Sequence, residues 1–134
     1  MMGQHSANFE EWRPDGIDKD YSWNVGEVRY SIDGSLTVDL FENTGRKAWI
    51  LMFATPLTVR ITQEGSLQEY WESGVVVAGH NLMRATSSSL LTWLDNSSGG
   101  VHSSDNMAHY AVFSDDVCVE VLSRVVPSLM PADA

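Results

Sequence analysis

The hydrophobic pattern of the chain is dominated by the stretch Lys47 to Thr62, KAWILMFATPLTVRIT. An unbroken apolar run from Ala48 to Phe53 is followed, after Thr55-Pro56, by strict alternation of apolar and polar residues. A short continuous run is typical of a strand buried on both faces, and alternation is typical of a strand with one face in water. The pattern therefore predicts two consecutive strands of one antiparallel sheet, the first of them at its centre.

Two hairpins flank this stretch in the sequence. The alternating segments Val28 to Ile32 and Leu36 to Leu40 are joined by Asp33-Gly34, which predicts a two-residue turn with the twist of paired strands. Together with the central stretch they form a meander over residues 25–63. A second hairpin is predicted over His109 to Leu122, with its turn at Ser114-Asp115-Asp116.

Two helical segments are predicted between the meander and the second hairpin. Ser66-Leu67-Gln68-Glu69 is a capping box that opens a short helical turn, which ends at Gly74. A longer helix is capped by Thr86 or Ser87, or starts one or two residues later because the serine run is a poor helix former, and it ends at Gly99-Gly100. Its apolar stripe consists of Leu90, Leu91 and Leu94, with Trp93 beside it. A helix of this length is unstable alone in water, so the stripe must be buried against the sheet.

These elements predict an α+β fold: a curved antiparallel sheet of about six strands, with one main helix packed on it and a short helical turn. We expect residues 1–134 to form a single domain. Residues 1–23 form an irregular N-terminal segment, whose aromatic residues either pack on the sheet edge or anchor a partner. Another strand is expected around His80 to Arg84, and residues 127–134 are predicted to be a disordered tail.

The charge balance narrows the classes of partner. Eight basic residues stand against 18 acidic ones, a net charge of −10. Nucleic acid is a polyanion and would be repelled by such a surface. The acidity suits either solubility alone or a basic protein partner, whose approach it would accelerate.

The compartment follows from cysteine usage and from the absence of targeting patterns. Cys118 is the single cysteine, so no internal disulfide forms, which fits a reducing environment. No stretch approaches the roughly 20 apolar residues of a membrane span. The N-terminus lacks the basic and apolar regions of a signal peptide. We therefore expect a cytoplasmic protein with no contact to membranes.

Catalytic and metal-binding patterns are weak. The four histidines lack the spacing of metal ligands, and no GxSxG, P-loop or GxGxxG motif is present, so we expect no metal, no cofactor and no enzyme activity. Cys118 and His109 are candidates for a nucleophile and its base, although a cysteine between valines is more typical of a small buried hydrophobe. Asp115 and Asp116 either form a carboxylate pair or shape the turn.

The order of elements resembles a known group of proteins. An acidic β-meander, SLTVDLFENTGRKAWILMFATPLTVRITQEGSL, precedes a helix, SSLLTWLDNSSGG, and the segment HYAVFSDDVCVEVLS. From Val25 to Leu122 this resembles small bacterial immunity proteins encoded beside polymorphic toxins, including those of contact-dependent growth inhibition. The resemblance implies a cytoplasmic protein that binds one toxin domain, often a nuclease, and blocks its active site. Those proteins share no functional residues, so no residue's role carries over.

The resulting prediction is an immunity protein that occludes the active site of a basic toxin, as a monomer in a 1:1 complex. The expected contact residues are the acids and the aromatic residue of the short helix, main helix, polar loop and last turn: Glu69, Trp71, Glu72, Asp95, Asp105, Asp115 and Asp116. Two alternatives stay open. One is a module that binds a small ligand in a cleft between the sheet and the helix. The other is a small enzyme that uses Cys118 and His109.

Overall fold

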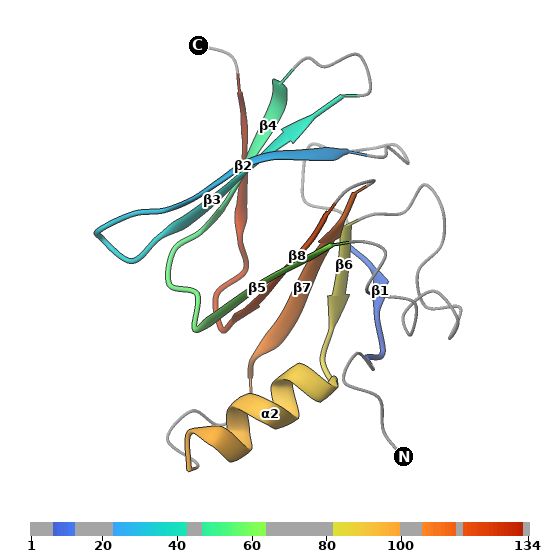
Figure 1. The fold of residues 1–134 in the computed structure, drawn as a ribbon, viewed down its shortest axis with the longest axis vertical. Coiled ribbons are helices and arrows are strands. Elements are labelled where there is room, and N and C mark those ends of the chain that lie inside the picture. The colour runs from blue at the N-terminus through green and yellow to red at the C-terminus, as the bar shows by residue number, and fades with distance from the viewer. Residues whose placement is uncertain are drawn as a thin grey trace.

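The computed structural model describes residues 7–12, 23–42, 47–63, 82–99, 106–114 and 117–132. One sheet is built from β1 (Glu10–Glu11), β5 (Thr58–Gln63), β6 (Leu82–Ala85), β7 (Ala108–Phe113) and β8 (Val117–Ser123). The other is built from β2 (Asn24–Tyr30), β3 (Leu36–Phe41), β4 (Lys47–Phe53) and β9 (Ser128–Pro131). Their strand orders are β1-β6-β7-β8-β5 and β2-β3-β4-β9, and neighbouring strands are antiparallel throughout. The two sheets lie one above the other in Figure 1.

The main core lies between the two sheets. Alternate residues of β3 and β4 point toward alternate residues of β6, β7 and β8, as the period of a strand requires. The members from these strands are Leu36, Val38, Leu40, Leu51, Phe53, Leu82, Ala108, Tyr110, Val112, Val119 and Val121. The rings of Phe53 and Tyr110 meet edge to face, with their centroids 5.7 Å apart. Burial of this apolar surface is what holds the sheets together.

The helix α2 (Ser89–Ser97) lies across one end of the five-stranded sheet in Figure 1 and packs on its outer face at Leu122. Ser88 is its N-cap, and the Ser88 hydroxyl accepts a hydrogen bond from the amide of Leu91. The predicted stripe of Leu90, Leu91 and Leu94 is buried against Met107 and Leu122, so the main helix and its buried face are confirmed. In the described part of the chain, no helix is long and apolar enough to cross a membrane.

The prediction of one curved sheet of about six strands is wrong, although the broad α+β class holds. The described residues form nine strands in two sheets. The error arises at residues 54–57, where the chain leaves β4 and crosses to the other sheet instead of pairing with its predecessor. Pro56 has no amide to donate to a ladder, which favours a break there. An alternating pattern is the same whichever sheet receives the strand.

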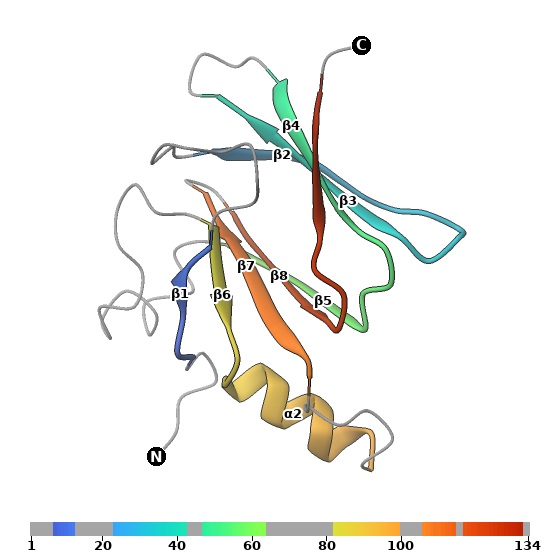
Figure 2. The same cartoon turned by 180° about the vertical axis from the view of Figure 1, so that it is seen from behind.

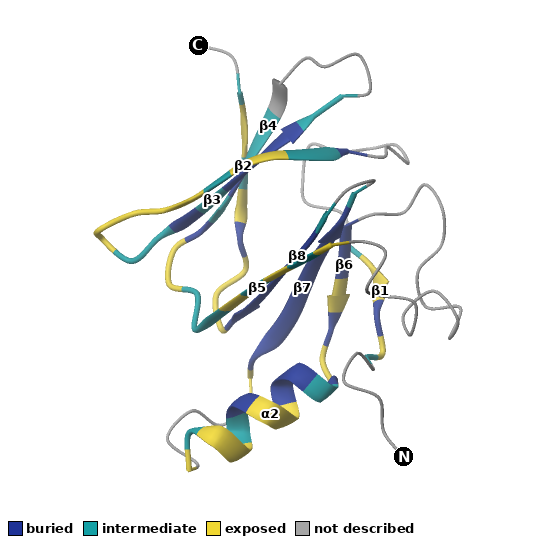
Figure 3. Ribbon diagram, in the orientation of Figure 1, coloured by how far each residue is buried: buried dark blue, intermediate teal, exposed yellow. Residues whose placement is uncertain are grey.

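The buried centre of the structure is the β7–β8 hairpin, and the prediction that β4 is buried on both faces is wrong. Leu51 and Phe53 of β4 are buried, but Ile50 and Met52 on its outer face are only half-buried. Every residue of β7, and all of β8 after Val117, is buried. Figure 3 shows β7 in dark blue along its length. The hairpin is enclosed because the second sheet covers one face and α2 with the N-terminal segment covers the other.

Both chain ends contribute more than predicted. Residues Ser128–Pro131, in the predicted disordered tail, form β9 and pair with β4. In the N-terminal segment, β1 pairs with β6, while Phe9 and Trp23 are buried and Trp12 packs on the core. The packing alternative is therefore correct for these three aromatic residues. The predicted helical turn at Ser66–Glu69 lies outside the described residues.

The β2–β3 hairpin is confirmed, but its turn is longer than predicted. Ser31 and Ser35 close a loop of three residues, with the Ser31 amide donating to the Ser35 carbonyl. Gly34 has φ +91°, the left-handed conformation that such a loop requires and that glycine adopts without strain. The Asp33 carboxylate accepts hydrogen bonds from the amide and the hydroxyl of Ser35.

The role of β9 can be tested by comparing two adjacent residues. Leu129 points inward against the main core, whereas Met130 is 41% exposed on the outer face. We expect Leu129→Ala to lower the free energy of unfolding by about 1–2 kcal/mol, because a partly buried leucine loses packing. Met130→Ala should change it by less than about 0.5 kcal/mol. Urea unfolding measures both, and equal effects would contradict the packing of β9 described here.

Candidate functional site

The edge strand β5 exposes its apolar residues and turns its polar ones inward. Val59 and Ile61 are 37% and 54% exposed, whereas Arg60 between them is half-buried. Val59 pairs with Val121 and Ile61 with Val119. Directly paired residues share a face of the sheet, so Val59 and Ile61 lie on the face that packs on the second sheet, yet that sheet leaves them uncovered. The two-sheet structure is therefore open along β5.

This opening is an apolar depression, here called the seam notch, of about 430 Å³. One wall comes from β2 and β3, and the other from β5 and the crossover before it. Its lining residues are Val28, Tyr30, Leu36, Pro56, Leu57, Thr58, Val59 and Ile61. Tyr30 is 69% exposed. In Figures 1 and 2 the β2–β3 hairpin extends away from the sheet that contains β5.

A second depression, here called the helix groove, lies on the other side of β5. It measures about 500 Å³ and is lined by Thr58, Val59, Arg60, Ser89, Leu90 and Trp93. Trp93 is 53% exposed on α2, beside the buried leucines. Thr58 and Val59 line both depressions. Strand β5 is therefore the ridge between two adjoining, largely apolar hollows.

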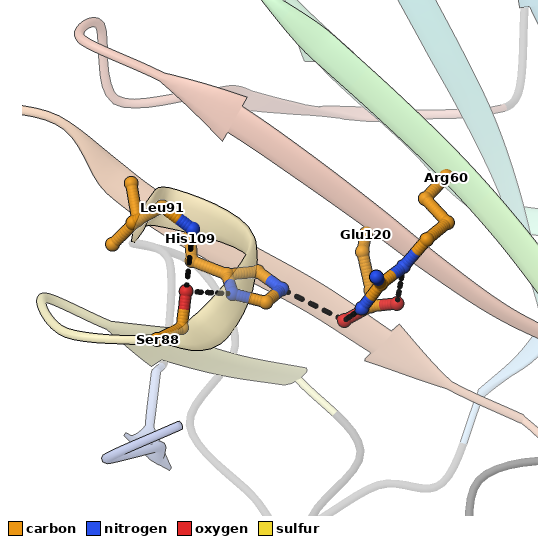
Figure 4. Close-up of polar contacts among 5 residues, drawn as sticks. All are labelled: Arg60, Ser88, Leu91, His109 and Glu120. Atoms are coloured by element: carbon orange, nitrogen blue, oxygen red, sulfur yellow. Dashed lines mark hydrogen bonds and ion pairs between the residues drawn. The ribbon is translucent and has the colours of Figure 1, made fainter. Parts of the chain in front are cut away.

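A buried polar network lies beneath the helix groove and is drawn in Figure 4. Arg60 donates to both carboxylate oxygens of Glu120, at 2.8 Å and 3.0 Å. Glu120 Oε1 is also 2.8 Å from His109 Nε2, and His109 Nδ1 is 2.8 Å from the Ser88 hydroxyl. His109 and Glu120 are fully buried. The network thus joins β5, β8, β7 and the N-cap of α2.

The donors and acceptors of the network fix its protonation. A Glu120 carboxylate that is paired with Arg60 can only accept, so His109 Nε2 carries the proton that it receives. Nδ1 then accepts from the Ser88 hydroxyl, which in turn accepts from the amide of Leu91. Burial lowers the pKa of His109, and this effect outweighs Glu120, whose hydrogen bond and charge raise it. His109 is therefore neutral in the folded protein at pH 7.

The order serine–histidine–glutamate is also the hydrogen-bond order of a catalytic triad. Here, however, Ser88 is only 7% exposed, and its oxygen caps α2 at 3.1 Å from the Leu91 amide. Phe9 lies over His109 with a ring-centroid distance of 4.9 Å. Ser88, His109 and Glu120 are therefore enclosed, and the network holds β5 and α2, the two walls of the helix groove, in place.

The hypothesis that Cys118 and His109 form a catalytic pair finds no geometric support. Cys118 pairs with Phe113 along the hairpin, whereas His109 pairs with Leu122, four positions away. Both ring nitrogens of His109 are engaged by other side chains. Cys118 is fully buried, and this burial raises the pKa of its thiol well above the usual range. The cysteine behaves as a small hydrophobe, which was the alternative interpretation.

Of the seven predicted contact residues, Asp95 lies in the described part of the chain. Asp95 lies on α2 and is half-buried. Glu69, Trp71, Glu72, Asp105, Asp115 and Asp116 lie outside the described residues. In the ranges that are described, no group of three histidine, cysteine or acidic side chains could hold a metal ion.

The exposed residues Tyr30, Val59, Ile61 and Trp93 were not predicted as site residues. An alternating strand pattern marks one face as apolar but does not say whether that face is covered. The nearest signal in the sequence is Pro56, which marks where β5 leaves the meander.

Comparisons with known proteins add little to this geometry. No protein-family model matches the chain, and no curated protein matches it. A solved structure similar to it is the crystal structure of an uncharacterized protein from Neisseria gonorrhoeae. It has 6% sequence identity and a TM-score of 0.46, and the match covers 85% of this chain and 93% of that chain. The resemblance to immunity proteins stays a prediction.

The lowered pKa of His109 predicts a loss of stability in mild acid. Below about pH 6.5 the unfolded chain binds a proton that the folded protein does not, so stability falls as the pH falls through this window. The slope is at most about 1.4 kcal/mol per pH unit. Urea unfolding between about pH 7.5 and 5.5 should show it in the wild type. His109→Gln should be less stable at pH 7, but its free energy of unfolding should fall less steeply with decreasing pH than that of the wild type. Equal slopes would contradict the assignment of a neutral His109.

The burial of Cys118 predicts an unreactive thiol. In the native protein, reaction with Ellman's reagent should be limited by opening of the structure, and in urea it should be rapid, because only the accessible thiolate reacts. If the thiol of the native protein instead reacts quickly, and does so already below pH 8, it is an activated thiol. That result would support the enzyme hypothesis.

Proposed function

We propose that this protein is an immunity-type inhibitor that binds a basic toxin domain and uses the surface around β5 to do so. The observation that carries the proposal is the exposure of Val59 and Ile61 on an edge strand, with an apolar depression on each side. Contiguous apolar surface rimmed by polar residues marks interaction sites in soluble proteins. Aromatic side chains such as Tyr30 and Trp93 dominate the energetics of such interfaces.

Other exposed hydrophobic residues support the same side of the molecule. In the described ranges, the large exposed ones are Tyr30, Ile32, Val59, Ile61, Trp93, Val125, Val126 and Met130. Ile32 lies at the tip of the β2–β3 hairpin, and Val125 and Val126 lie in the crossover from β8 to β9. Figures 1 and 2 both place this crossover beside the crossover that leads into β5. Most of the exposed apolar residues therefore belong to segments at the open side of the sheets.

The charge of the chain favours a basic partner. The net charge is −10, and this sum already counts two arginines that are paired with buried acids. Arg29 lies 3.2 Å from Asp39, and Arg60 lies 2.8 Å from Glu120. A toxin that cleaves nucleic acid must present positive charge to its substrate. An acidic inhibitor would be steered to that surface and would compete with the substrate for it.

The proposal comprises a cytoplasmic monomer that forms a 1:1 complex and blocks the active site of the toxin. It agrees with the resemblance of the sequence to immunity proteins. Burial of apolar anchor residues would provide the affinity of the complex, and the acidic residues around them would accelerate association.

A second candidate is a small-ligand module, which the helix groove of about 500 Å³ favours. The groove offers the indole of Trp93 and the hydroxyls of Thr58 and Ser89 beside Arg60. This volume is in the range of small-molecule sites. A ligand would quench the fluorescence of Trp93, and Trp93→Phe would remove that response. A ligand module needs no toxin-encoding gene beside its own, which separates it from the first candidate.

The proposed function predicts a 1:1 complex with the product of the neighbouring gene, whose association slows as salt rises because screening weakens the steering. Replacing two acids together, Asp115→Asn with Asp116→Asn, should slow association about 2–10-fold if they are contacts. The matched control is Glu10→Gln with Glu11→Gln on β1, at the opposite edge of the sheet from β5. Stopped-flow or surface-plasmon kinetics measure both. No complex, or a neighbouring gene without toxin character, overturns the proposal.

A further inference from the structure

We propose that β5 accepts an extended strand of the partner along its outer edge, with alternate side chains of that strand entering the seam notch and the helix groove. The identity of the partner rests on the proposed function, but the strand-accepting edge follows from the geometry of β5 itself.

The outer edge of β5 is a regular template for a strand. Its six residues pair with β8 without interruption, from Thr58 opposite Leu122 to Gln63 opposite Val117. In the part of the chain that the structure describes, no strand pairs with its other side. Exposed and half-buried residues alternate along its whole length. A strand of this length matches the usual length of strands in globular proteins.

The two hollows beside β5 have the arrangement that an added strand needs. Side chains of a strand point alternately to the two faces of its sheet. A strand placed beside β5 would direct one set toward Tyr30 and Ile61 in the seam notch, and the other toward Leu90 and Trp93 in the helix groove. In this mode of recognition, main-chain hydrogen bonds supply affinity, and pockets for alternate side chains supply specificity.

The other edges of the two sheets carry features that discourage pairing, and β5 does not. Natural edge strands are protected by shortness, charges, bulges or proline. Strand β1 has two residues, Glu10 and Glu11. Strand β2 has an irregular register between Val25 and Val28, and β9 has four residues and ends at Pro131. Strand β5 is regular and six residues long.

The one charged residue of β5 does not act as such a protection. Arg60 is turned to the helix side of the sheet, where Glu120 holds its guanidinium by two hydrogen bonds. The residues that β5 presents at the opening are Val59 and Ile61, which are β-branched and apolar. Such residues favour cross-strand pairing.

The occupant is a strand of a basic partner and not a second copy of this chain. Two copies joined through β5 would bring together two chains of net charge −10. At one end of the ladder, moreover, Gln63 is followed in the sequence by Glu64, and its pair Val117 is preceded by Asp115 and Asp116. The partner strand therefore carries apolar residues at alternate positions and lysine or arginine beside them.

A peptide experiment tests the edge independently of any toxin. The probe is a short synthetic peptide in which valine alternates with threonine and lysines stand at both ends; its counterpart has glutamates at the ends. With the lysine peptide at millimolar concentration, amide hydrogen exchange should slow at β5 and stay unchanged at β9. The glutamate peptide should protect β5 less. No added protection at β5, or equal protection by both peptides, overturns the proposal. Protection that rises with protein concentration, together with a doubled mass, would show pairing of two copies and overturns it as well.

Two matched variants test the same edge in the complex. Ile61→Lys places a charge in the seam notch, and Met130→Lys places one at an exposed position of β9 on the other sheet. Both positions are exposed, so both variants should fold, which urea unfolding checks. Ile61→Lys should weaken the complex about tenfold or more, and Met130→Lys less than about threefold. Equal effects overturn strand addition.

The failures of the two proposals are distinguishable. If the wild-type protein forms no complex with the neighbouring gene product but the lysine peptide still protects β5, the immunity function is wrong and the strand-accepting edge stands. If the complex forms but β5 gains no protection in it and Ile61→Lys binds normally, the edge proposal is wrong and the immunity function stands.

Discussion

The buried carboxylate of Glu120 is the constraint on which the candidate site depends. An ion that is fully enclosed is tolerable only when its charge is paired and its oxygens accept hydrogen bonds. Arg60 and His109 meet both requirements at 2.8–3.0 Å. To reach Glu120, Arg60 must point to the helix side of the sheet. Because side chains alternate along a strand, its neighbours Val59 and Ile61 must then point to the opposite face, into the opening between the sheets. The position of one buried acid thus accounts for the apolar face that β5 presents.

The same network places the second wall of the site. Ser88 donates to His109 and caps α2, so the start of the helix is tied to the centre of the sheet. The helix then carries Leu90 and Leu94 into the core and leaves Trp93 exposed beside β5. The helix groove is therefore held open by a polar network beneath it and not by its own apolar lining, which would favour collapse.

The main helix and the hairpins could be predicted from the sequence, whereas the strands at the two chain ends and the assembly of the sheets could not. Gly34 marks the first hairpin, and the leucines of α2 mark its buried face, because these signals depend on residues near one another in the chain. Which of the two sheets β5 joins depends on its pairing with β8, about 60 positions later in the sequence. The hydrophobic pattern contains no signal for this pairing. The burial of Glu120 and its contact with His109 were not predicted, for a related reason. A polar residue in an alternating strand is read as facing water unless its partner is known, and the partner here is Arg60 on another strand.

An open edge and a strongly acidic chain are best understood together. A regular, apolar edge strand is a hazard, since it can pair with any exposed strand, including its own copy. Proteins that need no such edge block it, as the short acidic β1 and the proline-ended β9 do here. Net charge provides another protection, because repulsion acts between identical chains before their edges meet. That repulsion becomes attraction when the approaching chain is basic. The acidity would then have two effects: it would prevent β5 from pairing with a second copy of this chain, and it would favour pairing with a basic partner.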